Sequence, residues 1–234
     1  MIAIGNFFFR YRNGIFPVVG VLLFIGGPKL LASDQLAAAL GFGVALAGMA
    51  LRCITIGLQY IKRGGLNRQV YADTLVQGGM FAHCRNPLYV GNLLGIIGLG
   101  LVANSLWFTC VGLPFFVFAY LAIVAAEENF LRKKFGAEFE TYCRRVSRWG
   151  LSLAGFGKTW QSMEFHWQRV VVKEYGSIFL WIATVCALMC RRYWREGNPF
   201  ANPAVTPWLW FLAAGAVAYA GARYLKKSRI LRAD

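Results

Sequence analysis

NLLGIIGLGLVANSLWFTCVGLPFFVFAYLAIVAA occupies Asn92–Ala126 and carries no charged side chain. A bilayer core needs about 20 helical residues, so this run is long enough to cross a membrane twice. The polar pair Asn104-Ser105 marks the break between the two crossings. The run therefore predicts a hairpin of two membrane helices.

The whole chain has the composition of a membrane protein. Its residues are 58% hydrophobic and 15% charged, which excludes a soluble domain with a solvated surface. Other apolar segments also predict membrane-spanning helices. We expect an all-α, polytopic integral membrane protein with about six transmembrane helices and interfacial amphipathic helices. The predicted apolar runs are Ile15–Ser33, Leu36–Tyr60, Leu88–Ala103, Leu106–Ala126, Gly176–Cys190 and Pro207–Leu225.

Charge placement predicts the orientation of these helices. Most of the 25 lysines and arginines fall at helix ends that share one side of the membrane if the N-terminus is inside. By the positive-inside rule, both termini are then cytoplasmic, and we expect the inner membrane of a bacterium. Anionic headgroups account for the net charge of +15, so no nucleic-acid partner is expected. The six cysteines are scattered, which predicts neither disulfides nor a zinc site.

We interpret the chain as a single membrane domain in three blocks. Residues 1–74 give two helices and a polar loop, Lys62–Thr74, and Arg10 and Arg12 precede a retained first helix. Residues 75–150 hold the hairpin and the segment after it. Residues 151–234 add a connector and two further helices.

Two amphipathic stretches predict interfacial helices. One apolar face recurs at steps of three and four residues, and Gly136 interrupts that helix. A weaker stripe follows in the connector, where we expect an interfacial anchor that faces water. The first face holds Leu131, Phe135, Phe139, Tyr142 and Val146, and the second stripe holds Trp160, Met163, Trp167, Val171 and Glu174.

Polar segments flank the hairpin on both sides. The first, Leu75–Gly91, reads LVQGGMFAHCRNPLYVG, and the second, Glu127–Val146, reads EENFLRKKFGAEFETYCRRV. Asn86 is a good N-cap, and Pro87 suits the first helical turn. A capped helix alone explains these two residues. The surrounding glycines and the helix start also favour the close approach of an anionic group such as a carboxylate.

Glu127 and Glu128 are placed unfavourably for a helix. They lie at a C-terminal end, where the helix dipole disfavours anions by about 0.3–1 kcal/mol. Either both side chains face water, or one of them binds a cationic or hydroxyl-rich ligand. Adjacent helical positions point about 100° apart, so we expect at most one of them to face a pocket squarely.

Arg52 lies deep within an apolar run, where a charge is expensive. Two interpretations stay open: it pairs with a carbonyl or glutamate for structural reasons, or it lines a tunnel for a lipid substrate. We expect His166 to be an interfacial hydrogen-bonding residue.

The two polar segments resemble the signature of the isoprenylcysteine carboxyl methyltransferase family. More distantly, they are similar to membrane phospholipid N-methyltransferases. The resemblance covers about residues 70–150 and implies an S-adenosylmethionine pocket between the segments. The cofactor-binding residues that it implies are Gly79, His83, Arg85, Asn86, Pro87, Tyr89, Gly91, Gly98, Gly100, Glu127 and Glu128.

The resemblance also implies catalytic roles, with two departures from the family. Arg145 aligns with an arginine that meets the acceptor, but the proline that follows it in the family is absent. Asn86 replaces the usual histidine, so the role of that imidazole is lost or taken by His83.

The implied activity is methyl transfer to a lipophilic or lipid-anchored acceptor, with membrane lipids as the other partners. A carboxylate acceptor is ionised at neutral pH and needs no base, whereas an amine must first lose a proton. Since His83 is the only imidazole near the predicted pocket, we favour carboxylate O-methylation. Phospholipid N-methylation is the alternative. A sterol-reductase-like NADPH enzyme, whose His-Arg-x-x-Arg-Asp segment is missing, and a non-catalytic scaffold are the competing classes.

Overall fold

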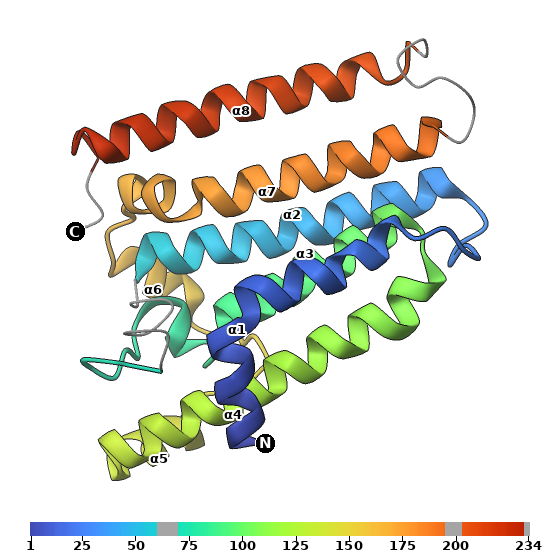
Figure 1. Ribbon diagram of the computed structural model, residues 1–234. Coiled ribbons are helices and arrows are strands. Elements are labelled where there is room, and N and C mark those ends of the chain that lie inside the picture. Colours follow the sequence, from blue (N-terminus) through green and yellow to red (C-terminus); the bar gives the residue numbers. More distant parts are fainter. Residues whose placement is uncertain (60–69, 195–202, 232–234) are drawn as a thin grey trace.

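The computed structural model describes residues 1–59, 70–194 and 203–231. Within these residues the chain forms helices and no strand, which confirms the all-α membrane fold. The long helices run side by side, and short helices gather at one end (Figure 1). The elements are α1 (Ile2–Gly20), η1 (Val21–Phe24), α2 (Asp34–Leu58), η2 (Gly79–Ala82), α3 (Pro87–Ala103), η3 (Phe108–Gly112), α4 (Leu113–Phe135), α5 (Ala137–Arg145), α6 (Phe156–Gln161), α7 (Trp167–Trp194) and α8 (Thr206–Lys227).

Four helical stretches within the described residues are long and apolar enough to cross a membrane. They are Ile2–Phe24, Asp34–Leu58, Phe108–Phe135 and Trp167–Tyr193. The other two predicted spans correspond to α3, which has 17 residues, and to α8, which lies beside α7 (Figure 1). Residues 60–69, which hold most of the predicted polar loop and the end of the run Leu36–Tyr60, lie outside the described residues.

Glycines allow α2 and α3 to pack very closely. A Cβ at Gly48 would lie 2.6 Å from the Gly91 carbonyl oxygen, and one at Gly98 would lie 2.6 Å from that of Gly41. Small residues at facing positions permit this backbone approach between membrane helices. The two helices form one closely packed pair, and the polar residues of α3 belong to it.

The hairpin break lies at Asn104-Ser105, as predicted. Asn104 ends α3 in the left-handed region, with φ 48°, and its side-chain oxygen accepts hydrogen bonds from the Leu30 and Leu31 amides at 3.1 and 2.8 Å. The Ser105 hydroxyl accepts from the Phe108 amide at 3.2 Å, where the chain turns into η3. These contacts satisfy the backbone groups that the break exposes.

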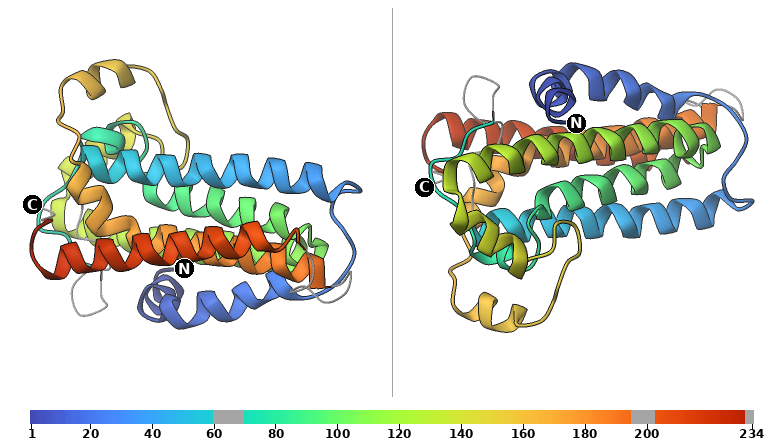
Figure 2. Two further views of the ribbon diagram at one scale, coloured as in Figure 1. Left: turned by 90° about the horizontal axis from the view of Figure 1, so that it is seen from above. Right: turned by 90° about the horizontal axis from the view of Figure 1, so that it is seen from below.

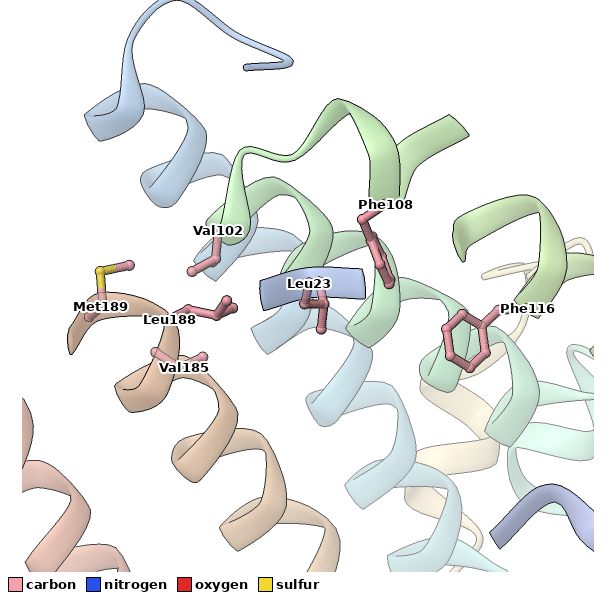
Figure 3. Close-up of a cluster of buried hydrophobic side chains, with 7 residues drawn as sticks. All are labelled: Leu23, Val102, Phe108, Phe116, Val185, Leu188 and Met189. Carbon is pink, nitrogen blue, oxygen red and sulfur yellow. The ribbon is translucent and has the colours of Figure 1, made fainter. Parts of the chain in front are cut away.

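A cluster of apolar side chains closes the bundle at the hairpin end, by which we mean residues 25–33 and 104–107. Figure 3 shows side chains from η1, α3, η3, α4 and α7 that meet there. A cavity of about 240 Å³ remains beside this cluster, and a larger one lies between the helices toward the opposite end. The cluster consists of Leu23, Val102, Phe108, Phe116, Val185, Leu188 and Met189.

The prediction of the first helix over Ile15–Ser33 is wrong. The helix begins at Ile2 and, with η1, ends at Phe24, and it bends in its middle (Figure 2). Pro17 lacks the N–H that would bond to residue 13, which explains the bend. Arg12, interpreted as a flanking charge, lies inside the helix, with its guanidinium 4.4 Å from the centre of the Phe9 ring.

The fifth predicted span, Gly176–Cys190, is too short, because α7 begins at Trp167. The charge that ended the apolar run is buried: Glu174 has an exposed fraction of 0%. Our interpretation of the stripe from Trp160 to Glu174 as a solvated anchor is therefore wrong at Glu174.

The predicted break at Gly136 separates α4 from α5, and Gly136 has a φ of 51°. The predicted apolar face of this segment also packs together. Phe139, Tyr142 and Val146 form a buried cluster, with Leu131 and Phe135 against it.

Candidate active site

A cavity of about 1500 Å³ lies between helices α1, α2, α3, α4 and α7. Residues 70–76 and 162–166 complete its wall at the end opposite the hairpin. Ligand pockets usually have volumes of about 300–1,000 Å³, so this cavity has room for two molecules at once.

The cavity brings together half of the residues predicted for the site. These are Arg85, Asn86, Pro87, Tyr89, Glu127 and Glu128. The other six predicted residues are not among the described residues that line the cavity. They are Gly79, His83, Gly91, Gly98, Gly100 and Arg145.

Glu128 is buried beside two arginines. Its side chain lies within 3.3 Å of Arg85 Nη2, and Arg148 donates to both of its oxygens, from Nε at 3.0 Å and from Nη2. Two cations around one carboxylate offset the cost of burying its charge. Arg148 was not among the predicted site residues, because nothing in the local pattern indicates that the chain returns to α4 after α5.

Backbone contacts explain how Arg148 reaches Glu128. The Arg85 amide donates to the Ser147 carbonyl at 2.9 Å, and Asn86 Nδ2 donates to the Arg148 carbonyl at 3.0 Å. The Cys84 thiol lies 3.7 Å from the same carbonyl oxygen, and burial raises the pKa of this thiol. The segment after α5 is thus docked against the start of α3.

Asn86 occupies the N-cap of α3 and Pro87 its first turn, as predicted. The Asn86 side chain does not cap the helix, however, because it bonds to the Arg148 carbonyl instead. At the position where the family has a histidine, Asn86 therefore holds the segment after α5 in place through its side chain.

Glu127 meets a different set of partners from Glu128. Its Oε1 accepts a hydrogen bond from the Tyr89 hydroxyl at 2.7 Å, and Arg12 Nη1 lies 3.4 Å from the same hydroxyl. Tyr89 is therefore the link between α1, α3 and α4. Arg12 was not among the predicted site residues, because it was assigned to the flank of the first helix.

His83 is used for structure. Its Nδ1 lies 2.9 Å from the Ser152 carbonyl oxygen, its Nε2 lies 2.9 Å from Thr159 Oγ1, and its ring contacts Phe156. Both ring nitrogens thus hold the connector that carries α6. The placement of His83 gives no support to the predicted catalytic role.

Four predicted glycines serve packing or backbone geometry. Gly79 has a φ of 56° and begins η2. Gly91 and Gly98 face α2, and a Cβ at Gly100 would lie 2.8 Å from the Phe108 ring. These placements give no support to a role in cofactor binding.

Arg145 is exposed at the surface of α5, where it donates to Gln77 Oε1 at 2.9 Å. Gln77 in turn donates to Glu138 at 2.9 Å. This placement gives no support to the predicted contact of Arg145 with the acceptor.

Arg52 pairs with a glutamate, which confirms the structural interpretation, while its role in a lipid-substrate tunnel stays a prediction. It donates to Glu174 of α7 from Nε and from Nη2, each at 2.9 Å, and to the Asn92 side chain from Nη1. It also lines the cavity, together with Asn92, Tyr120 and Ser177.

Two arginines on the cavity wall have capacity for a ligand. Arg85 Nε and Arg169 Nε are buried and have no hydrogen-bond partner among the described residues. A buried donor without a partner is costly, so it marks a place where a bound group can contribute. His166, expected only as an interfacial residue, also lines the cavity.

Known proteins are similar to this chain. The phospholipid methyltransferase family matches residues 38–138. The cobalt-zinc-cadmium resistance protein CzcN of Cupriavidus metallidurans is 34% identical over 174 residues, which are 71% of this chain and 77% of CzcN. The nickel-cobalt-cadmium resistance protein NccN of Alcaligenes xylosoxydans xylosoxydans is 31% identical over 144 residues, which are 60% and 65% of the two chains. No solved structure is significantly similar to the chain.

Proposed function

Because this chain belongs to the phospholipid methyltransferase family of membrane methyltransferases, we propose that it transfers a methyl group from S-adenosylmethionine to a lipophilic acceptor. The observation that carries the proposal is the meeting of two glutamates of α4 with the start of α3 in one cavity. Glu127, Glu128, Arg85 and Tyr89 all line it.

The side chains at this end of the cavity fit the polar groups of S-adenosylmethionine. Glu127 is a carboxylate whose bonded neighbour is the neutral Tyr89 hydroxyl, so it suits an ammonium group or sugar hydroxyls. The buried Nε of Arg85 and the N-terminus of α3 suit a carboxylate. When bound, the cofactor supplies a methyl group on a positively charged sulfur, which is already activated for transfer.

The protein must therefore mainly align the acceptor and exclude water. Tyr89 orients the Glu127 carboxylate through its 2.7 Å hydrogen bond. Arg85 and Arg148 fix Glu128 from the other side. The closely packed pair of α2 and α3 holds Arg52 and Asn92 on the wall of the same cavity.

We propose carboxylate O-methylation as the reaction, because an ionised carboxylate needs no base. A second candidate is N-methylation of a phospholipid amine. The observation that favours it is His166, an imidazole on the cavity wall that can accept the proton of an ammonium group.

We propose that the cavity opens to the cytoplasm of a bacterium, with both chain termini on that side. The basic residues of α5 and the end of α8 lie at the cavity end of the bundle (Figure 1), in accord with the positive-inside rule. The names of the two relatives concern metal resistance and specify neither a reaction nor an acceptor.

Incubation of membranes that contain the protein with methyl-labelled S-adenosylmethionine tests the reaction. Label that is released by base indicates an ester, and label on phospholipid that resists base indicates an amine. The matched control is the Glu127→Gln, Glu128→Gln double variant. Equal labelling with and without the active protein would contradict the proposal.

A further inference from the structure

One face of the first half of α7 lines the cavity, together with His166 just before the helix begins. The residues recur at steps of three and four, so they lie on one side of the helix. They change from basic to apolar along the chain, in the order His166, Arg169, Lys173, Ser177 and Leu180. The last of them reaches the outside of the bundle, since Leu180 has an exposed fraction of 67%.

Arg169, in the basic part of this stripe, has a donor that can bind an anion. Arg169 Nε is buried without a partner among the described residues, and its Nη1 lies at the long distance of 3.5 Å from the Ile56 carbonyl oxygen. Lys173 is one helical turn further along the same face, about 6 Å away along the axis. Two cations at this spacing can bind one oxyanion together, and the arginine does so through hydrogen bonds from its guanidinium N–H groups.

Carboxylates in or beside the cavity accept hydrogen bonds from other side chains, and Glu127 of α4 accepts one from the Tyr89 hydroxyl. Glu174, next to Lys173, turns to Arg52 of α2. Glu128 is held by Arg85 and Arg148. Asp73 and Glu164, which also line the cavity, come from the segments that close its end.

Resting on the proposed methyltransferase function, we infer that α7 recognises the acceptor. Arg169 and Lys173 bind an oxyanion, either phosphate or carboxylate, on the head of an amphiphilic molecule. Its hydrocarbon part follows Ser177 and Leu180 toward the lipid, over about 16 Å of helix from Arg169. The match to the family ends at residue 138, so this recognition site comes from a helix outside the matched region.

Chain-matched probes test the inference without knowledge of the natural acceptor. The purified protein is placed in nanodiscs of zwitterionic lipid and titrated with tetradecyl phosphate, tetradecanoate, tetradecanol and tetradecylammonium. We expect at least one of the two anions to bind about tenfold more tightly than the alcohol, and the cation to bind most weakly. Tighter phosphate binding identifies a lipid phosphate, and base-labile methylation of tetradecanoate identifies the carboxylate as the nucleophile.

Two double variants separate this site from general surface charge. Arg169→Gln, Lys173→Gln removes the cations of the cavity and should abolish the preference for anions. Arg223→Gln, Lys227→Gln removes two basic residues at the same spacing on α8, outside the cavity wall of the described residues, and should preserve it. If the first double variant does not fold, Arg169→Gln alone should still reduce the preference.

Two results would overturn the inference: equal affinity of the wild type for the alcohol and both anions, or an equal loss in both double variants. The affinity for S-adenosylmethionine is measured in parallel and should be unchanged by either pair of substitutions. Failure of the wild type to bind that cofactor would overturn the proposed function instead, whatever the probes do.

Discussion

Glu127 and Glu128 differ in partners although they are adjacent. We expected at most one to face a pocket, yet both line the cavity, with Glu128 toward two arginines and Glu127 toward Tyr89. The charge of Glu128 is already compensated by the protein. Glu127, bonded to a neutral hydroxyl, is therefore the carboxylate with the greater capacity to bind a cationic or hydroxyl-bearing ligand.

The family resemblance points to Arg145 as a site residue, whereas the contacts in the structure point to Arg148. Arg148 touches Glu128 in the cavity wall, whereas Arg145 contacts Gln77 on the surface. We expect Arg148→Gln to lower methyl transfer about tenfold or more, because hydrogen bonds to charged groups contribute about 1.5–3 kcal/mol, and Arg145→Gln to leave it within about twofold. The reverse order in an assay with labelled cofactor would restore the predicted role of Arg145.

Tyr142 ties α5 to the segment before α3 by donating to the Phe81 carbonyl at 2.7 Å. Tyr142→Phe should lower the free energy of unfolding by about 1 kcal/mol at neutral pH. Burial raises the pKa of this hydroxyl, so the folded state favours the protonated form. Its contribution is complete below about pH 10, the ordinary pKa of tyrosine, and falls at higher pH.

Thermal denaturation of wild type and Tyr142→Phe from neutral to alkaline pH checks this dependence. The stability difference between them should be constant up to about pH 10 and then shrink. A difference that widens above that pH would contradict the assigned direction.

Helix breaks that depend on residues close in the sequence could be predicted from local patterns. The break at Asn104-Ser105 and the split at Gly136 follow from polar and glycine residues within apolar stretches. The start of α1 and the first part of α7 could not be predicted in this way. Arg12 and Glu174 look like flanking charges in the sequence, but distant partners, Tyr89 and Arg52, accommodate them inside the bundle.

The same limit applies to the candidate site. The glutamates and the start of α3 belong to two motifs that a single hairpin brings together, so they were predictable. Arg148 reaches Glu128, and His166 reaches the cavity wall, because the chain after α5 folds back toward α3 and α4. No periodicity within those segments indicates this return.

The contact between α2 and α3 provides a test of whether Gly98 serves packing or the cofactor. A Cβ at Gly98 would lie 2.5 Å from Ala45 Cβ, so Gly98→Ala should cost about 1–3 kcal/mol through overpacking. At Gly95 an added Cβ meets no atom of the described residues within 4 Å, so Gly95→Ala should not destabilise. Thermal denaturation checks both variants. A loss of cofactor affinity in folded Gly98→Ala without a loss of stability would favour the cofactor role.

The Arg52–Glu174 pair joins α2 to α7 inside the bundle. Glu174→Met leaves a buried cation and should lower the free energy of unfolding by about 3–5 kcal/mol. Arg52→Met, Glu174→Met replaces both charges by apolar side chains and should recover most of that loss. Denaturation in detergent checks the order, and a double variant no more stable than the single one would contradict it.

At the scale of the whole molecule, the two ends of the bundle have separate tasks. An apolar cluster packs at the hairpin end (Figure 3), while polar side chains from five helices line the larger cavity at the other end. The family match spans α2, α3, α4 and the start of α5, and the last two helices lie beyond it. We propose that the matched part binds the cofactor and that α7 selects the acceptor.

We propose that the end of the cavity at Glu127 binds S-adenosylmethionine. Calorimetric titration of the purified protein with this cofactor tests it most directly. We predict saturable binding by the wild type, and about a tenfold or greater loss of affinity in Glu127→Gln with the melting temperature preserved. No binding by the wild type, or undiminished affinity in both Glu127→Gln and Glu128→Gln, would contradict the claim.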